Sequence, residues 1–205
     1  MRAIIGARSG ARTIGLASLM LALALALTCI AQEKQKPDES SSEMHQMIVT
    51  TQGFLAIDTP KGWVQSEGPG LAFFLPEGVD RHSAEVWIYI SGAPVGPNEE
   101  DRDAKAYIQS DIAGYKQHFK NGVVREEEPI FIPQTKQQAP CYSFQSGESH
   151  NAFEQVVYID DGNRVLTLTI SAKNSAALKR SLGSFHEFAQ SYRGSIQMGS
   201  GDDKK

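Results

Sequence analysis

The sequence predicts an α+β domain in which a largely antiparallel sheet is flanked by two main helices. Three observations support this class. Two stretches carry apolar residues at helical spacing, several short runs have the composition of strands, and one pair of runs is joined by a hairpin dipeptide. Of the 205 residues, 40% are hydrophobic and 21% are charged, which suffices for one packed domain with tails.

Residues 1–31 have the composition of a secretory signal peptide. Three arginines precede an apolar run at 14–27, and that run is shorter than the roughly 20 residues of a membrane-spanning helix. We predict cleavage after Ala31, and hence a periplasmic or secreted protein. The alternative is lipidation of Cys29, which would anchor the protein in a membrane, although the preceding residues Ala26-Leu27-Thr28 fit a lipobox poorly.

Cleavage would leave a mildly acidic chain. It removes Arg2, Arg8 and Arg12 and no acid, so that 17 Lys and Arg remain against 24 Asp and Glu, a net charge of −7. Such a chain does not attract phosphate backbones or anionic lipids, which argues against nucleic acid as a partner. Only Cys141 would remain, so no intramolecular disulfide can form.

Composition divides the rest of the chain into three parts. Residues 32–49 are rich in Glu, Lys, Gln and Ser and are predicted to form a disordered tether. Residues 50–193 have the size of a single domain. Residues 194–205 are poor in apolar side chains and are predicted to be a disordered tail.

The first half of the domain contains three strand candidates, at 54–57, 71–75 and 84–90, which turn residues separate. Residues 84–90 alternate strictly. Val86, Ile88 and Ile90 share one face, and Trp87 and Tyr89 share the other. The aromatic pair predicts that this second face is covered at least in part.

A core-facing amphipathic helix follows. Pro97 and Asn98 are predicted to start and cap it, acidic residues at 99–101 to occupy its first turn, and Asn121-Gly122 to end it in the left-handed conformation. Its apolar stripe is Ala104, Tyr107, Ile108, Ile112, Tyr115 and Phe119. Further strands are predicted at 123–125, 129–133 and 141–145.

The best-specified element is a hairpin of residues 153–160 and 163–171 around the turn dipeptide Asp161-Gly162. A two-residue loop there would place Val157 opposite Leu166 and Glu154 opposite Thr169. A second helix follows, capped by Asn174 or Ser175 and predicted to end at Gly194. Its stripe is Leu178, Leu182, Phe185, Phe188, Ala189 and Tyr192.

This order resembles the PsbP-like superfamily. The superfamily includes the photosystem II extrinsic protein, a nuclear-transport factor that releases nucleotide from Ran, and bacterial DcrB-like envelope proteins. The resemblance covers about residues 50–193. It is carried by Gly53-Phe54, Pro60-Lys61-Gly62-Trp63, Phe73-Phe74, Tyr158 with Asp161-Gly162, and a closing helix near Phe188. It implies an antiparallel sheet between helices and a role without catalysis, and no functional residue of the family can be matched onto this chain.

Catalytic and metal-binding signatures are scarce. The sequence lacks a nucleophile elbow, a phosphate-binding loop, a zinc-protease motif and paired cysteines. Its five histidines, His45, His82, His118, His150 and His186, are not spaced as metal ligands. We expect His118 and His186 to face solvent. Cys141 is predicted to be a small buried hydrophobe rather than a reactive thiol.

We therefore predict a non-enzymatic exported binding module that acts on a protein partner in the bacterial cell envelope, with no catalytic, metal or cofactor residue. One alternative is an envelope hydrolase that uses the loop Gly147-Glu148-Ser149-His150. Another is a small-molecule or copper carrier. This carrier would use either the soft ligands of Met44-His45-Gln46-Met47 or a cleft at the Trp87-Tyr89 face.

Overall fold

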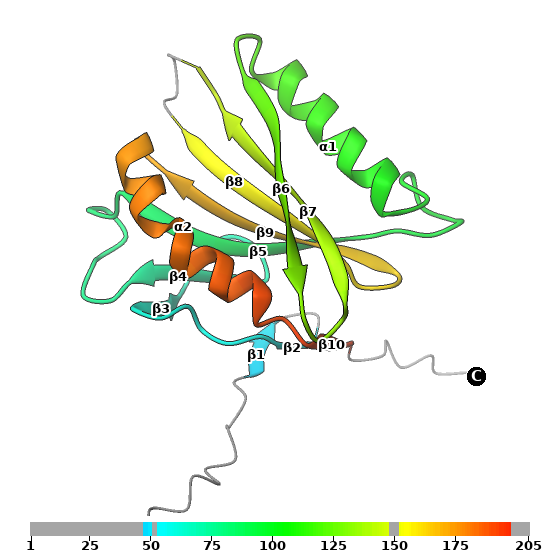
Figure 1. Ribbon diagram of the computed structural model, residues 1–205, viewed down its shortest axis with the longest axis horizontal. Helices are drawn as coiled ribbons and strands as arrows, with labels where there is room; N and C mark the ends of the chain where they lie inside the picture. Colours follow the sequence, from blue (N-terminus) through cyan, green and yellow to red (C-terminus); the bar gives the residue numbers. More distant parts are fainter. Residues whose placement is uncertain (1–46, 51–52, 148–151, 198–205) are drawn as a thin grey trace, which may run out of the picture. The chain divides into compact units, whose positions relative to one another are not determined.

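The computed structural model describes residues 47–50, 53–147 and 152–197, which form two antiparallel sheets and two helices (Figure 1). The large sheet has the strand order β3-β4-β5-β9-β8-β7-β6, and the small sheet has the order β1-β2-β10. The elements are β1 (Met47–Thr50), β2 (Gly53–Ala56), β3 (Trp63–Ser66), β4 (Ala72–Pro76), β5 (Val86–Pro94), α1 (Ala104–His118), β6 (Val123–Ile132), β7 (Gln137–Gln145), β8 (Phe153–Asp160), β9 (Arg164–Ala172), α2 (Ser175–Gln190) and β10 (Gly194–Gln197). The predicted α+β class, a largely antiparallel sheet flanked by two helices, is confirmed.

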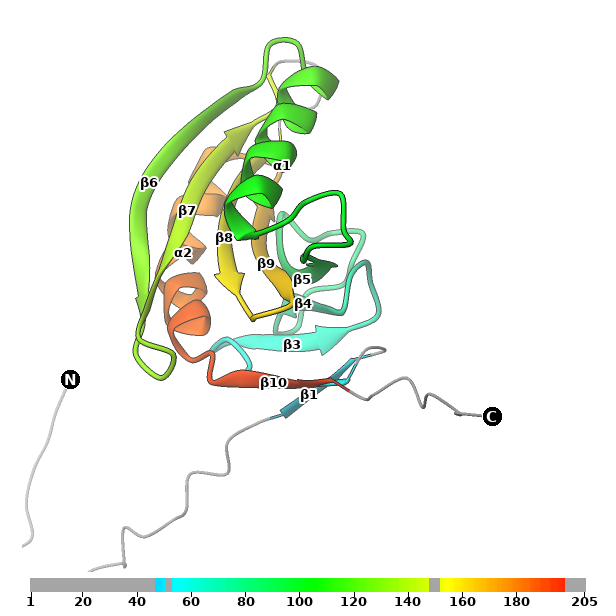
Figure 2. The same cartoon turned by 90° about the vertical axis from the view of Figure 1, so that its right-hand side faces the viewer.

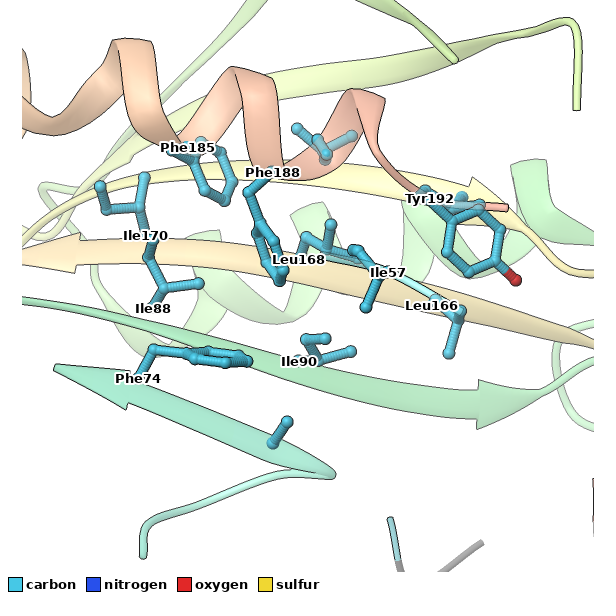
Figure 3. Packing of buried hydrophobic residues seen from close by; sticks show 14 of the residues in the cluster. Ile57, Phe74, Ile88, Ile90, Leu166, Leu168, Ile170, Phe185, Phe188 and Tyr192 are labelled. Carbon is cyan, nitrogen blue, oxygen red and sulfur yellow. The ribbon is translucent and has the colours of Figure 1, made fainter. Parts of the chain in front are cut away.

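The two helices pack on opposite faces of the large sheet (Figures 1 and 2). The main core lies between the sheet and α2. Phe185 and Phe188 of α2 are buried there on Ile88, Leu168 and Ile170 (Figure 3). The ring of Phe188 meets that of Phe74 edge-on, with centroids 5.4 Å apart. The predicted helical stripe and the predicted inward face of β5 thus form a single core.

Helix α1 begins later than the sequence indicated. Its N-cap is Asp103, whose carboxylate accepts the backbone N–H of Ala106 at 2.8 Å, so the predicted start at Pro97 and Asn98 is wrong. The residues between them form a turn in which Glu99 donates its N–H to the carbonyl of Gly96. The acidic residues 99–101, which were predicted to occupy the first turn, therefore precede the helix, and Asp103 caps it by satisfying an N–H of that turn.

Both helices also end earlier than predicted. Helix α1 stops at His118, and Gly122 does not adopt the predicted left-handed conformation. A Cβ there would lie 2.9 Å from Tyr115 and Phe119, so close packing explains this glycine. Helix α2 has the predicted cap Asn174, whose side chain accepts the N–H of Ala177, but it ends at Gln190 rather than at Gly194.

The β8–β9 hairpin is present, with its register displaced by two residues. Val157 lies opposite Leu168, and Glu154 lies opposite Ser171 rather than Thr169. The corner consists of Gly162, at φ +83°, and Asn163, because Asp161 already pairs with Arg164. Glycine at the first central position suits a type II′ turn. A displacement of two leaves every side chain on its predicted face.

Several observed strands of the large sheet are longer than predicted, and one of its strands was not predicted at all. The separate runs at 123–125 and 129–133 form one strand, β6, which is interrupted by an irregularity between Glu127 and Ile130. β3 was not predicted. It follows a turn in which Trp63 donates its N–H to the carbonyl of Pro60, and the indole is buried in the main core.

The small sheet corrects the predicted tether and tail. Residues 47–49 and 194–197 were expected to be disordered, but they form β1 and β10, one on each side of β2. Arg193 anchors this end through a bidentate ion pair with Asp58, with N···O distances of 2.8 and 3.0 Å. Arg193 and Asp58 are 135 residues apart in the sequence, so no local sequence pattern could predict their contact.

Candidate functional site

A cavity of about 300 Å³ lies between α1 and the large sheet. Ligand pockets begin at about this volume. Its walls are aromatic rings, hydroxyl groups and two carboxyls, supplied by Tyr89, Ser91, Tyr107, Asp111, Tyr115, Phe119, Phe144, Ser146, Ala152, Glu154, Val156, Thr167 and Thr169.

Strand alternation produces this polar wall. In β9, Leu166, Leu168 and Ile170 point toward α2, whereas Thr167 and Thr169 point to the α1 side. All five side chains are buried. A strand buried on both faces usually carries apolar residues throughout. A hydrophobic cluster around Ile108, Val156 and Val165 also lies under α1, and the hydroxyl row beside it indicates a candidate site.

The two carboxyls belong to different elements. Burial raises the pKa of Glu154 on β8, and the carboxylate of Asp111 on α1 raises it further, while the Ser171 hydroxyl that hydrogen-bonds to it acts in the opposite direction. Asp111 accepts a hydrogen bond of 2.5 Å from the hydroxyl of Tyr158. Burial and this contact with Asp111 both raise the pKa of Tyr158.

Three tyrosines bring polar groups to the cavity. Burial raises the pKa of Tyr89 and of Tyr115 to about 12. The Tyr107 hydroxyl lies 3.5 Å from that of Thr167. Among the described residues, the Tyr115 hydroxyl is a buried polar atom without a hydrogen-bond partner, although the Ser146 hydroxyl is close enough to act on its pKa. A buried hydroxyl of this kind is an unused donor and acceptor.

No lysine, arginine or histidine is among the described residues that line the cavity. Two carboxyls therefore face it without a side-chain cation to balance them. The described part of the chain also holds no group of three or more His, Cys, Asp or Glu that could bind a metal ion.

The outer face of the small sheet is a second candidate surface. Met47, Val49 and Ile196 are 50%, 63% and 61% exposed. The register places Val49 and Ile196 on either side of Phe54 on β2, so that the three side chains form a row. We call Met47, Val49, Phe54 and Ile196 the apolar row. Clustered exposed apolar side chains are typical of contact surfaces.

Those residues singled out from the sequence that the structure describes do not converge on one site. Cys141 is buried, as predicted, and burial raises its pKa to about 12. His118 and His82 are exposed, but His186 is half-buried with Nε2 2.6 Å from the Gln155 amide oxygen, so its predicted exposure is wrong. His186 lies on the side of α2 that faces Gln155 of β8. The helical pattern alone could not indicate a polar partner on the sheet.

Other predicted sites lie outside the described residues. These are Cys29, the ligands Met44 and His45, and the residues Glu148, Ser149 and His150 of the proposed hydrolase loop. Met47 is described and belongs to β1. The helices of the described part are all too short or too polar to cross a membrane.

The predicted cleft at the Trp87-Tyr89 face corresponds in part to the cavity. Tyr89 lines it, whereas Trp87 packs in a smaller cluster with Phe73, Leu75 and Ala84. Sequence analysis missed Asp111 and Tyr115 as site residues because it assigned this helix to the core. The signal available in the sequence was the alternation of Thr167 and Thr169 with leucines. Because the structure buries every residue of this strand, that alternation places the hydroxyls under α1.

Comparisons with known proteins concern the fold. No protein-family model and no curated protein matches the chain. Among solved structures, it is similar to cyanobacterial PsbP (CyanoP) from Synechocystis sp. PCC 6803, with 9% identity, a TM-score of 0.41, and coverage of 68% of this chain and 84% of that one. It is also similar to the Ran-binding protein Mog1p of Saccharomyces cerevisiae, with 10% identity, a TM-score of 0.44, and coverage of 67% and 88%. The sequence predicted a PsbP-like fold, and cyanobacterial PsbP is among the solved structures that are similar to this chain.

Proposed function

We propose that this protein is an exported, non-enzymatic binding module of the bacterial cell envelope, and that it binds a protein partner through the apolar row. The observation that carries the proposal is the exposure of Val49 and Ile196 on both sides of Phe54. Burial of these side chains by a partner would remove apolar surface from water, which is the main driving force of protein association.

The geometry of the small sheet favours a partner that supplies an extended apolar segment. β2 is paired on both sides, whereas β1 and β10 each pair only with β2 among the described strands. Their outer edges therefore present backbone donors and acceptors next to the apolar row. Addition of a strand at such an edge is a common mode of peptide recognition.

Site-specific cross-linking in intact cells tests the surface. A photoreactive residue at Val49 should give an adduct with another protein, and Ile196→Ser should reduce its yield. The matched control is the same photoreactive residue at Val123, which is 41% exposed on β6. Equal adducts from both positions, no adduct from Val49, or an adduct only with a second copy of this chain would each contradict the proposal.

Export has its own test. Cell fractionation should recover a mature chain that begins at Gln32, the residue after the predicted cleavage site. If Cys29 is lipidated instead, globomycin will block processing and the mature chain will sediment with membranes. Recovery of the uncleaved chain from the cytoplasm would overturn export, whatever the cross-linking shows.

A further inference from the structure

We propose that the cavity between α1 and the large sheet binds a small organic ammonium ion. This site is separate from the apolar row and does not depend on the protein-binding function. The proposal rests on the charge, the aromatic walls and the unpartnered hydroxyl of the cavity.

Charge is the first argument. Glu154 and Asp111 face the cavity, and the described lining residues offer no cationic side chain in return. A partly buried carboxylate without a counter-charge is unfavourable in a medium of low dielectric constant. An ammonium ion in the cavity would supply the missing charge to both carboxyls.

The aromatic walls are the second argument. Tyr107 and Tyr115 of α1 and Phe144 of β7 present rings to the cavity, and Tyr115 and Phe144 meet edge-on with centroids 4.8 Å apart. The faces of such rings attract cations, and cages of this type recognise quaternary ammonium groups. The faces of the same rings repel an anion.

The unpartnered hydroxyl of Tyr115 is the third argument. It is buried, and no described residue meets the geometry of a hydrogen bond with it, although the Ser146 hydroxyl lies near enough to lower its pKa. A hydroxyl on the ligand can satisfy this group, which favours an ammonium compound with a polar arm. A metal ion is disfavoured because the described residues hold no group of three acidic, His or Cys side chains to bind it.

Two other hollows of the described surface differ from this cavity in having cations at their rims. The one beside the start of α1 is larger, at about 440 Å³. It is bordered by Lys105 and by the amides of Gln109, Gln137 and Gln138, so a cation is already present at its rim. A third hollow of about 230 Å³ shares Phe144 and Glu154 with the cavity, but it is also bordered by Arg125 and Lys179.

Choline and neopentylcarbinol, its uncharged carbon isostere, form a matched pair of probes. We expect choline to bind the full mature chain at least about tenfold more tightly than the isostere, with NMR shift changes at Tyr115 and Thr169. Glu154→Gln should weaken choline binding by about tenfold or more and leave the isostere unaffected. The control is Glu126→Gln, an exposed carboxyl on β6, which should change neither affinity.

The pH dependence gives a second measurement on the unaltered protein. Protonation of Glu154 removes its charge, so choline binding should weaken as the pH falls through the raised pKa of this group. The titratable groups that face it in the cavity are Asp111 and Tyr115 from α1 and Tyr89 from β5, and both tyrosines remain neutral over this range. Arg125 from β6 and Lys179 from α2 line the neighbouring hollow, which Glu154 also borders. Equal affinity for the two probes, no binding of either, an undiminished affinity of the folded Glu154→Gln variant, or binding that is independent of pH would overturn the proposal.

Discussion

The carboxylate of Asp161 connects the corner of the β8–β9 hairpin to a segment more than 30 residues later, and its replacement by alanine should strongly destabilise the fold. It accepts Nε–H of Arg164 at 2.8 Å, the hydroxyl of Tyr192 at 2.5 Å and the hydroxyl of Ser195. The side chains of Arg164 and Asp161 are only 6% and 12% exposed. The hairpin corner, the end of α2 and β10 therefore meet at one buried anion.

Asp161→Ala leaves the guanidinium of Arg164 buried without its ion-pair partner. Loss of one partner from a buried pair costs about 3–5 kcal/mol. In a domain of this size each kcal/mol lowers Tm by roughly 2–4 °C, so we expect a decrease of about 6–20 °C. Thermal unfolding followed by circular dichroism measures this change, and urea unfolding gives the free energy directly.

An exposed ion pair is the matched control for this experiment. Arg180 and Glu85 lie 3.6 Å apart, and their side chains are 67% and 60% exposed. Arg180→Ala should cost about 0–1 kcal/mol because solvent screens such pairs. If Asp161→Ala destabilises the protein no more than Arg180→Ala does, the argument that the buried carboxylate holds this end of the fold is wrong.

Three further predictions concern protonation and reactivity. Because burial raises the pKa of Glu154 in the fold, stability should fall as the pH rises from its unfolded pKa through its folded pKa. Glu154→Gln should flatten this part of the urea-unfolding profile and be the more stable form at pH 7. Burial lowers the pKa of His186, so stability should also fall as the pH drops from about 6.5 toward its folded pKa, and His186→Gln should remove this decrease. The Cys141 thiol, with a pKa of about 12, should react with a disulfide reagent at the rate of global unfolding, and fast labelling of the folded protein would contradict its burial.

Local periodicity was sufficient to predict the side of the sheet on which the residues of β5 and of the β8–β9 hairpin lie. The predicted face of Val86, Ile88 and Ile90 is the core face, and the stripe with Phe185 and Phe188 covers it. Even the wrong register of the hairpin preserved these assignments, because a displacement of two residues does not change the alternation. Face assignments depend on nearest neighbours in the sequence, and therefore they survive errors in strand pairing.

Contacts over long separations could not be predicted from the sequence. β10 contains Ser195 and Ile196 in a stretch of polar composition, and it becomes a strand because β2 offers a free edge and because Asp58 and Asp161 bind Arg193 and Ser195. β1 has only four residues and depends on the same partner strand. Composition alone assigns such segments to disorder, since their stability comes entirely from tertiary contacts.

The large sheet combines stability and polar chemistry by separating them onto its two faces. Toward α2, Leu166, Leu168 and Ile170 bury apolar surface, which is the dominant favourable contribution to folding. Toward α1, the same strand buries Thr167 and Thr169 beside the carboxyl of Glu154, whose raised pKa shows that its charged form is disfavoured there. A face selected for stability alone would carry valine in place of these hydroxyls and no carboxyl, because polar groups gain little from burial. The hydroxyls of Thr167 and Thr169 and the carboxyl of Glu154 thus lie on the face that α1 covers, and the apolar core beneath α2 offsets the cost of burying them.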